Sequence, residues 1–259
     1  SSDLPQAYIS SDRTYQVNVL GTHELIKHLE KTSPKAFFMF SSSIAIYGDR
    51  LKTPHIMVTD PLHEEDEDFY VQSKIKAERV VQKSTMDWTI YRLTAILGVN
   101  NHKITGLMFH NPLDTCMEIA TPEDAARAFV NGINHRQALA HKVFNLGGGE
   151  NCRTSYRSLL EKNLEINGLG KLDFPKKSFA EKNFHCGYMM DSDVLEEIVR
   201  FRRHTLEDYY RLNEIAVSKI QKFFSALLKK QIKYFLGRMS LPLKAYRGKD
   251  TVLMERFFE

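Results

Sequence analysis

The stretch Phe69-Tyr70-Val71-Gln72-Ser73-Lys74 decides both the fold and the candidate chemistry of this chain. Apolar residues continue from it at helical spacing to Val81, which predicts a helix that ends near Lys83. On a helix, Tyr70 and Lys74 project from one face, one turn apart. A lysine ammonium at that position lowers the pKa of a phenol, and a phenol with a lowered pKa can exchange a proton with a carbinol oxygen.

The spacing Tyr-x-x-x-Lys alone is not specific, because many solvated amphipathic helices carry such a pair. The sequence upstream makes it specific. An apolar run over 36–40 ends in Ser41-Ser42-Ser43 and continues as Ile44-Ala45-Ile46-Tyr47-Gly48. This pattern predicts a buried strand over 36–42 with hydroxyl groups at its carboxyl end, where open α/β sheets bind their ligands. A serine there can hold a reacting oxygen by hydrogen bonding.

Three motifs of this chain resemble, in their order, those of the extended short-chain dehydrogenase/reductase family. They are Asn18-Val19-Leu20-Gly21-Thr22, the serine stretch 41–48 and Tyr70-x-x-x-Lys74. The most similar branch is the NAD-dependent epimerase/dehydratase group that acts on nucleotide sugars. The resemblance runs from about residue 12 to about residue 210. It implies an α/β fold, a Rossmann-like doubly wound parallel sheet with a small C-terminal substrate lobe, and NAD or NADP as the cofactor.

The resemblance also implies roles for the residues of the Tyr70-x-x-x-Lys74 motif and of the serine stretch. Tyr70 would move the hydroxyl proton during hydride transfer, and Lys74 would lower the pKa of Tyr70 and bind the nicotinamide ribose. Ser43 would hold the reacting oxygen, with Ser42 as the alternative. Ser41 and Ser42 would lie against the cofactor.

Asn18 and Arg92 complete the candidate site. The family places an asparagine like Asn18 beside the active site, where it supports the catalytic lysine, but a helix-surface or capping role is an equal alternative. Arg92 stands in the predicted strand 88–93, just before the family's cofactor-contacting loop. Leu93 and Leu97-Gly98-Val99 depart from the Arg-Pro and Tyr-Gly-Pro common in the family, which leaves the substrate subclass open. The candidate cofactor-binding residues are therefore Tyr70, Lys74, Ser41, Ser42 and Arg92.

The glycine-rich turn that opens a dinucleotide-binding fold is not found in this sequence. Gly21 is the first glycine, and Gly147-Gly148-Gly149 follows a predicted strand over 143–146 without the required spacing, so we predict a tight turn there. The resemblance places Asn18 on the helix after the fourth strand, so we expect about 80 residues of the usual architecture to be missing from this sequence, judging by the size of a mononucleotide-binding half. Without them the sheet is expected to expose an apolar edge. The residue that distinguishes NAD from NADP belongs to that part.

The composition is that of a soluble globular protein and gives no sign of nucleic-acid binding or of a disulfide framework. An apolar fraction of 42% and a charged fraction of 26% are typical of soluble globular proteins, and a net charge of +4 does not indicate nucleic-acid binding. Cys116, Cys152 and Cys186 form no C-x-x-C pair, which argues against a disulfide framework or a cysteine zinc site. They suit a reducing compartment, so we expect a cytoplasmic protein.

The organisation we expect is an incomplete NAD(P)-binding domain over 1–150, in which 99–121 forms substrate-lobe loops, a C-terminal substrate lobe over 151–210 and a basic helical tail over 211–259. Thr121 and Pro122 predict a helix start, with Asp124 as an acid of its first turn. The acidic run 64–68 predicts a solvated loop that leads into an acidic first helical turn. Arg202 and Arg203 either meet a diphosphate or form a surface pair.

The tail carries an apolar stripe from Ile215 to Leu236, flanked by lysines. Such a stripe most commonly packs on its own domain or on a partner subunit. A basic amphipathic helix can also lie on an anionic membrane surface. The segment after Pro242 is expected to be loosely ordered.

The function implied by the resemblance is an NAD(P)-dependent epimerase or reductase acting on a hydroxyl or keto group, with a nucleotide sugar as the expected small-molecule substrate. Ile44-Ala45 stands where the 4,6-dehydratases of the family carry Asp-Glu, which counts against dehydration. Two alternatives remain: a non-catalytic relative that binds a partner or membrane through its tail, and a dehydrogenase of a non-sugar alcohol such as a steroid or flavonoid. No nucleic-acid partner is expected, while a homodimer and a peripheral membrane contact through 215–238 are left open.

Overall fold

A computed structural model of the 259-residue chain describes residues 11–63, 68–99, 104–182 and 185–258. Most of the acidic run (64–67), residues 100–103 of the expected lobe loop and the N-terminal segment 1–10 therefore lie outside the described residues. The strands are β1 (Phe37–Ser43), β2 (His55–Ile56), β3 (Asp87–Leu93), β4 (Ala95–Ile96), β5 (Cys116–Ala120), β6 (Lys142–Leu146), β7 (Arg153–Ser155) and β8 (Tyr188–Met189). The α-helices are α2 (Ser11–Tyr15), α3 (Gly21–Thr32), α4 (Phe69–Gln82), α5 (Pro122–Gly132), α6 (Arg136–Leu139), α7 (Tyr156–Ile166), α8 (Asp193–Val199), α9 (Leu206–Ala216), α10 (Lys219–Leu227), α11 (Lys229–Met239), α12 (Leu241–Gly248) and α13 (Thr251–Phe257).

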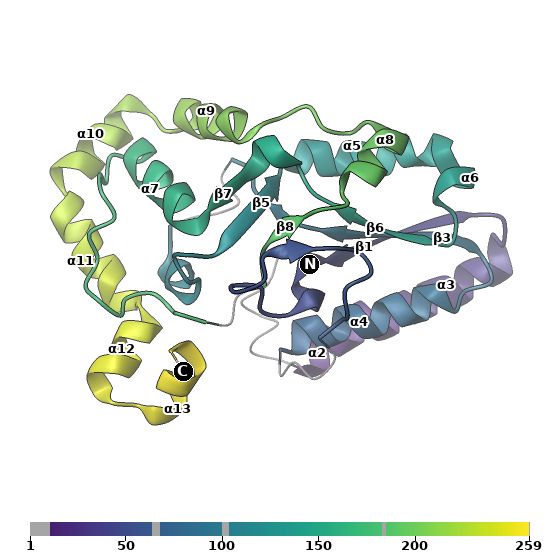
Figure 1. Cartoon of the computed structure of the whole chain (residues 1–259), viewed down its shortest axis with the longest axis horizontal. Coiled ribbons are helices and arrows are strands. Elements are labelled where there is room, and N and C mark those ends of the chain that lie inside the picture. Colours follow the sequence, from purple (N-terminus) through teal and green to yellow (C-terminus); the bar gives the residue numbers. More distant parts are fainter. Residues whose placement is uncertain (1–10, 64–67, 100–103, 183–184, 259) are drawn as a thin grey trace.

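The main sheet is parallel, with strand order β1-β3-β6, and helices cover both of its faces (Figure 1). Successive side chains of β1 point to opposite faces, as the period of a strand requires. Phe38 and Phe40 pack with α3 and α4, whereas Phe37 and Met39 pack with α5, α6 and α8. The predicted doubly wound α/β fold is confirmed.

Strand β1 lies at the edge of this sheet. Among the described strands it pairs only with β3, from Phe37 opposite Asp87 to Ser43 opposite Leu93. Its four apolar residues over 37–40 are only partly buried. The exposed apolar edge that the sequence predicts is therefore found at β1.

A second lobe is built around β5, which pairs with β4 in parallel and with β7 in antiparallel orientation. Its core joins Phe109 and Ile119 to residues of α7, α9 and α11. We expected only loops over 99–121, and β5 corrects that prediction. The strand escaped recognition because Glu118 interrupts its apolar pattern, although the side chain of Glu118 is buried and accepts hydrogen bonds from Gly149 N and Arg153 Nε, each at 3.0 Å.

The described segment after Pro242 is largely helical, in α12 and α13, which corrects the prediction of a loosely ordered end. The hydroxyl of Ser240 accepts a hydrogen bond from Leu243 N at 3.0 Å, and Pro242 occupies the first turn of α12, where a missing N–H costs nothing. Phe257 and Ala245 then bury against Ala180. The expected helix of the apolar stripe over 215–236 is divided among the end of α9, α10 and α11, because Ser218 caps a new helix at α10 and Leu228 separates α10 from α11.

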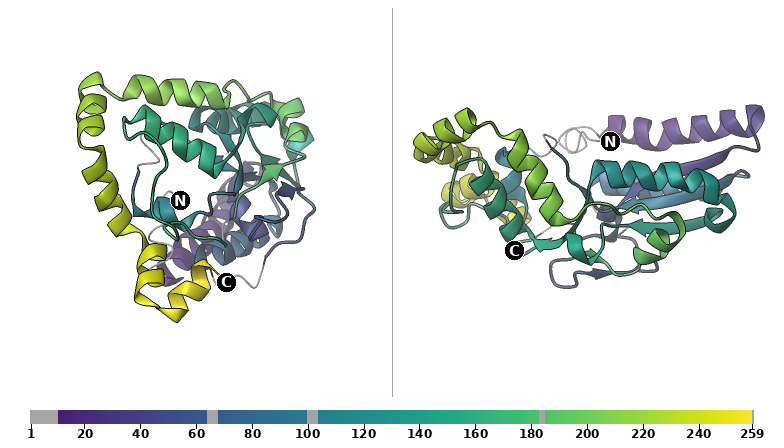
Figure 2. Two further views of the ribbon diagram at one scale, coloured as in Figure 1. Left: turned by 60° about the vertical axis from the view of Figure 1, so that its left-hand side comes forward. Right: turned by 90° about the horizontal axis from the view of Figure 1, so that it is seen from above.

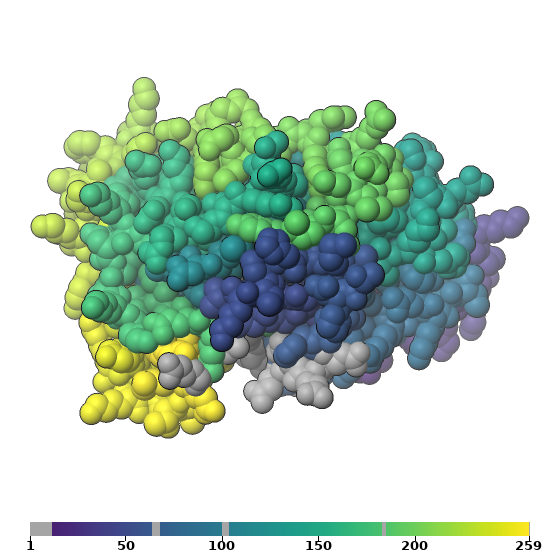
Figure 3. Space-filling model, in the orientation of Figure 1, coloured from purple at the N-terminus to yellow at the C-terminus, as the bar shows by residue number. Residues whose placement is uncertain are grey.

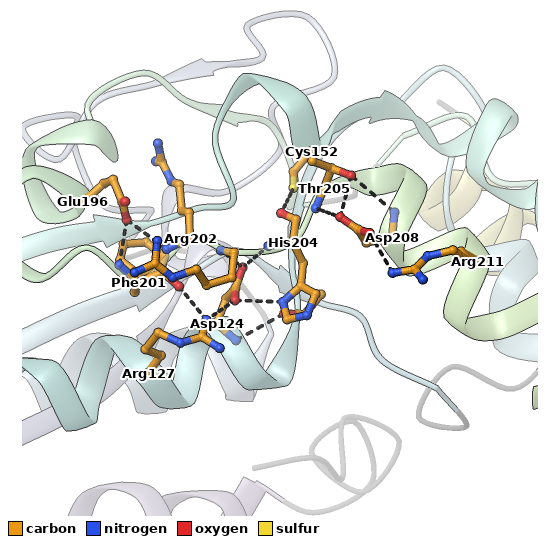
Figure 4. Close-up of polar contacts among 12 residues, drawn as sticks. Asp124, Arg127, Cys152, Glu196, Phe201, Arg202, His204, Thr205, Asp208 and Arg211 are labelled. Carbon is orange, nitrogen blue, oxygen red and sulfur yellow. Dashed lines mark hydrogen bonds and ion pairs between the residues drawn. The ribbon is translucent and has the colours of Figure 1, made fainter. Parts of the chain in front are cut away.

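A connecting segment, residues 201–205, joins α8 to α9 and is fixed by the buried carboxylate of Asp124 (Figure 4). Asp124 accepts hydrogen bonds from the backbone N–H groups of Arg203 and His204, at 2.9 and 3.0 Å, and it forms an ion pair with Arg127. Thr121 caps α5, and Asp124 is an acid of its first turn, as predicted, that also anchors this segment. Burial raises the pKa of Asp124, but these hydrogen bonds outweigh it, and the net pKa is lowered.

We expect Asp124→Ala to lower the free energy of unfolding by about 3 kcal/mol at neutral pH, because buried N–H groups and Arg127 lose their acceptor. Since the folded pKa lies below the unfolded one, this contribution is present above the unfolded pKa and is lost as the pH falls through the folded pKa. Urea unfolding measures the change. The matched control is Glu123→Ala, an exposed acid of the same helical turn, which should change stability by less than about 0.5 kcal/mol. Equal losses in both variants would show that Asp124 acts only on the helix dipole.

Candidate active site

The candidate site lies where the carboxyl end of β1 meets the first turns of α4. Lys74 is buried, with 4% of its surface exposed, and its Nζ donates a hydrogen bond to the carbonyl oxygen of Ser41 at 3.0 Å. The segment that follows β1, dark blue in the space-filling view, runs over the front of the molecule beside this junction (Figure 3). The predicted strand and helix thus bring Lys74 to the serine stretch.

Ser43 and Tyr70 meet through a hydrogen bond between their side-chain hydroxyls. Both residues are held by helix caps. Ser43 caps the 3₁₀ helix Ile44–Tyr47, because its oxygen accepts a hydrogen bond from Ala45 N at 3.2 Å. Asp68 caps α4, and its carboxylate accepts from Tyr70 N at 2.8 Å. The geometry therefore favours Ser43 over Ser42 as the partner of the phenol.

The pKa of Tyr70 is raised in this structure, whereas we predicted that Lys74 lowers it. Burial raises the pKa of the phenol, the hydrogen bond with Ser43 acts against that rise, and the charge of Asp68 adds to it. The ammonium group lies 5.8 Å from the centre of the Tyr70 ring and is turned toward Ser41. Burial lowers the pKa of Lys74 itself from its ordinary 10.5 to about 8, although the nearby carboxylate of Glu78 opposes that change.

A lysine with a lowered pKa destabilises the fold while it is charged. Between about pH 8 and 10.5 the unfolded chain binds a proton at Lys74 that the folded chain has released, so stability rises with pH across that window. Below pH 8, burial of the charged ammonium lowers the free energy of unfolding by roughly 3 kcal/mol. The hydrogen bond to Ser41 restores about 1 kcal/mol of this loss. We therefore expect Lys74→Met to stabilise the protein by about 2 kcal/mol at pH 7.

This gain should shrink as the pH rises from 8 toward 10.5, as thermal unfolding at several pH values would measure. Lys76→Met, at an exposed position of the same helix, serves as the control and should change stability by less than about 0.5 kcal/mol at every pH. Destabilisation by Lys74→Met would mean that this lysine is a structural residue.

Asn18 lies in a π-helical turn, Gln16–Leu20, between α2 and α3. Such single turns within α-helices frequently occur at functional sites. The amide Nδ2 of Asn18 donates to Ser73 Oγ at 2.9 Å, and that hydroxyl donates to the carbonyl oxygen of Tyr70 at 2.8 Å. Asn18 thus supports the first turn of α4 through Ser73, and within the described part of the chain its side chain forms no hydrogen bond with Lys74 itself.

The surroundings of Arg92 do not support the cofactor contact that we predicted for it. Its guanidinium is buried and forms a two-bond ion pair with Glu78, at 2.9 and 3.1 Å, and a further hydrogen bond with the hydroxyl of Tyr47 at 2.8 Å. The sequence analysis did not single out Glu78, of which only 1% is exposed. The signal was available in part, since Glu78 follows Lys74 by one turn.

Arg202 likewise lacks the freedom to meet a diphosphate. It donates to the carbonyl oxygen of Gly147 at 2.9 Å and to Ser192 Oγ at 2.7 Å, and it pairs with Asp193. The glycine cluster 147–149 has no regular structure and leads into the 3₁₀ helix Glu150–Cys152, which corrects the predicted tight turn; Gly149 has a φ of 83°, which favours glycine. The side chain of Arg203 is exposed, as the surface alternative predicted.

The residues at the end of β1 fit the nicotinamide end of a dinucleotide. The hydroxyl of Ser42 is buried without a hydrogen-bond partner among the described residues. The ammonium of Lys74 has three donors and makes one hydrogen bond within the described part of the chain. Both groups lie at the carboxyl edge of a parallel sheet, where such folds bind ligands. The fit concerns the ribose and nicotinamide only, since the sequence holds no glycine-rich phosphate turn.

Comparison with known proteins agrees with this geometry. The family model NAD_binding_4, described as "Male sterility protein", matches residues 7–141, which is more than half of the chain. No protein of the curated set matches the sequence.

Solved structures with the same fold include proteins complexed with NAD or NADPH. RMD from Pseudomonas aeruginosa, complexed with NADPH, is 18% identical with a TM-score of 0.66, over 83% of this chain and 78% of that one. UDP-glucose 4-epimerase from Thermotoga maritima, with UDP-glucose, is 19% identical with a TM-score of 0.63, over 86% and 74%. DesIV, a dTDP-glucose 4,6-dehydratase from Streptomyces venezuelae with NAD, is 17% identical with a TM-score of 0.64, over 83% and 70%. The predicted fold of the extended short-chain dehydrogenase/reductase type is confirmed.

Proposed function

Because the chain belongs to the NAD-binding family described as male sterility protein, we propose that it carries the proton-transfer half of an NAD(P)-dependent oxidoreduction at a hydroxyl or keto carbon. The observation that supports this proposal most is the contact between the hydroxyls of Tyr70 and Ser43, with Lys74 buried one turn further along α4. A phenol, a hydroxyl and an amine at one strand end are the groups that such a proton transfer needs.

Each residue has a distinct role in this proposal. Ser43 holds the reacting oxygen of the substrate by a hydrogen bond, and Tyr70 gives or takes the proton at that oxygen. Lys74 binds the ribose hydroxyls with its unused donors and holds positive charge beside the phenol when a ligand draws its ammonium away from Ser41. Asn18 keeps Tyr70 in place through Ser73. When bound, the nicotinamide supplies or accepts the hydride.

For the substrate we propose a nucleotide sugar, and for the reaction an epimerisation or reduction. Support for the substrate comes from the structural neighbours, whose names include UDP-glucose and dTDP-glucose. Against dehydration stand Ile44 and Ala45, the apolar residues directly after Ser43, because removal of water needs further acid and base groups at the substrate.

The test combines binding with turnover. The whole chain is titrated with NAD and with NADP by calorimetry, and is then incubated with UDP- and dTDP-hexoses. Nicotinamide absorbance reports net reduction, and proton NMR of the sugar reports epimerisation, which leaves the cofactor unchanged. We expect one dinucleotide to bind and Lys74→Met to weaken that binding by about tenfold, the value of one charge-assisted hydrogen bond. The absence of binding of either dinucleotide would overturn the proposal for this chain.

A further inference from the structure

Helix α10 turns its apolar face away from the protein. Ile220, Phe223, Phe224 and Leu227 recur at helical spacing on one side of it, and each is between 54% and 71% exposed. Ser225 and Lys222, on the opposite side, are the more covered residues, and Lys222 lies against Gly168 of the lobe. A surface helix of a globular protein normally shows the reverse arrangement. The expectation that this part of the stripe packs on its own domain is therefore wrong.

The apolar surface continues onto α11. Ile232 and Leu236 of that helix face the lobe core, whereas Phe235 and Met239 are 62% and 50% exposed. Leu228, between the two helices, is 45% exposed. The exposed residues of α10 and α11 and Leu228 together form what we call the α10–α11 face. Clustered exposed apolar residues of this kind mark an interaction surface.

The segment that carries this face has charges of a single sign. Residues 215–249 contain nine basic residues and no aspartate or glutamate. Among the ion pairs described, Lys222 meets Glu214 at 3.7 Å and Lys233 pairs with Asp173, so two of the cations have acidic partners from neighbouring segments. The nine basic residues are Lys219, Lys222, Lys229, Lys230, Lys233, Arg238, Lys244, Arg247 and Lys249.

The two helices form an outer corner of the molecule, at the end remote from α3 and the sheet (Figures 1 and 2). A broad flat partner could therefore reach the α10–α11 face without touching β1 or α4. Within the described part of the chain no helix is long and apolar enough to cross a bilayer, so the contact would be with a surface.

We propose that the α10–α11 face binds the surface of an anionic lipid bilayer. The aromatic and aliphatic side chains of α10 enter the boundary between headgroups and acyl chains, and the lysines at its flanks contact the anionic headgroups, which is how basic amphipathic helices bind membranes. Charge complementarity selects this occupant. In a symmetric dimer the same patch meets itself, and here that would bring two sets of unbalanced lysines together, which is repulsive.

Flotation of the whole chain with lipid vesicles tests the proposal. We expect binding to vesicles of phosphatidylcholine with phosphatidylserine, weakening as salt is added, and little binding to phosphatidylcholine alone. A basic residue near an anionic surface strengthens binding about fivefold, so Lys219→Gln combined with Lys229→Gln and Lys230→Gln should weaken it by about 100-fold. Phe223→Ser with Leu227→Ser should weaken it by about tenfold or more through lost apolar insertion.

The matched control is Val130→Ser with Ile133→Ser, which removes two equally exposed apolar residues, at 62% and 65%, at the end of α5. It should bind vesicles like the parent chain, and circular dichroism confirms that every variant folds. Equal binding to neutral and anionic vesicles, or equal loss in the control, would overturn the proposal. So would a chain that ignores vesicles but forms a dimer that Phe223→Ser dissociates, since the face would then belong to a second copy.

Discussion

Tyr70→Phe is expected to lower the rate of turnover by about 10²- to 10⁴-fold, the usual contribution of a positioned general acid or base. The change removes one hydroxyl and leaves the ring, so the aromatic contact with Lys74 and the cap from Asp68 to Tyr70 N remain. Although the ammonium of Lys74 lies 5.8 Å from the centre of the ring, burial raises the pKa of Tyr70. Proton transfer therefore depends on the hydroxyl of Ser43 and on charge that ligands bring to the site.

The measurement is turnover with whichever nucleotide sugar and cofactor are active, together with the dissociation constant of the cofactor. Cofactor affinity should change by less than about threefold, since the expected loss lies in the chemical step. Tyr209→Phe is the matched control, because this buried tyrosine also loses one hydroxyl with one side-chain hydrogen bond, to Asn163 at 3.3 Å. Turnover that survives Tyr70→Phe, with the control unchanged, would exclude Tyr70 as the proton-transfer group and with it the proposed mechanism.

The core of the site could be predicted from the sequence because its signals are local. Tyr70 and Lys74 stand one helical turn apart, and the serines at 41–43 directly end an apolar strand, so motif and periodicity suffice to bring them together. The same holds for the cap at Thr121 and for the helices that follow it. Their geometry needs no information from distant parts of the chain.

Buried charges could not be predicted, because their partners come from other elements. Glu118 is satisfied by Gly149 and Arg153, which lie 31 and 35 positions further on. Asp124 is satisfied by backbone groups 79 and 80 positions away. A local pattern treats an acid as solvated, since burial is favourable only when partners are present.

The direction of an amphipathic face is a second property that periodicity leaves undetermined. The pattern over 215–236 correctly predicts helices with one apolar side, but the direction of that side follows from the break at Ser218 and from the packing of α11. The α11 part faces the lobe core, while the α10 part faces solvent. Only the tertiary arrangement distinguishes them.

Glu78→Ala is expected to lower the free energy of unfolding by about 3–5 kcal/mol, because it leaves the guanidinium of Arg92 buried without its carboxylate. Both side chains are almost completely buried, at 2% and 6% exposed, so solvent does not screen the pair. Arg92→Met alone should cost a similar amount, since it leaves Glu78 as the unpaired charge. Combining the two should cost less than the sum of the single losses, because no unpaired charge then remains.

Glu78 also acts on the active site, because its charge raises the pKa of Lys74 against the effect of burial. Removing that charge should move the pKa of Lys74 further below 8, so the alkaline limb of cofactor affinity should shift to lower pH in Glu78→Ala. Urea unfolding of the four members of the cycle gives the coupling, and cofactor titration against pH gives the shift. Arg79→Ala, an exposed neighbour in α4, is the control for both.

Strict additivity in the cycle would show that Glu78 and Arg92 are not coupled. Coupling without a shift in the pH dependence of cofactor affinity would restrict the role of Glu78 to the stability of the fold. Coupling together with the shift would show that one buried carboxylate both stabilises the sheet at Arg92 and sets the charge of the lysine beside the phenol.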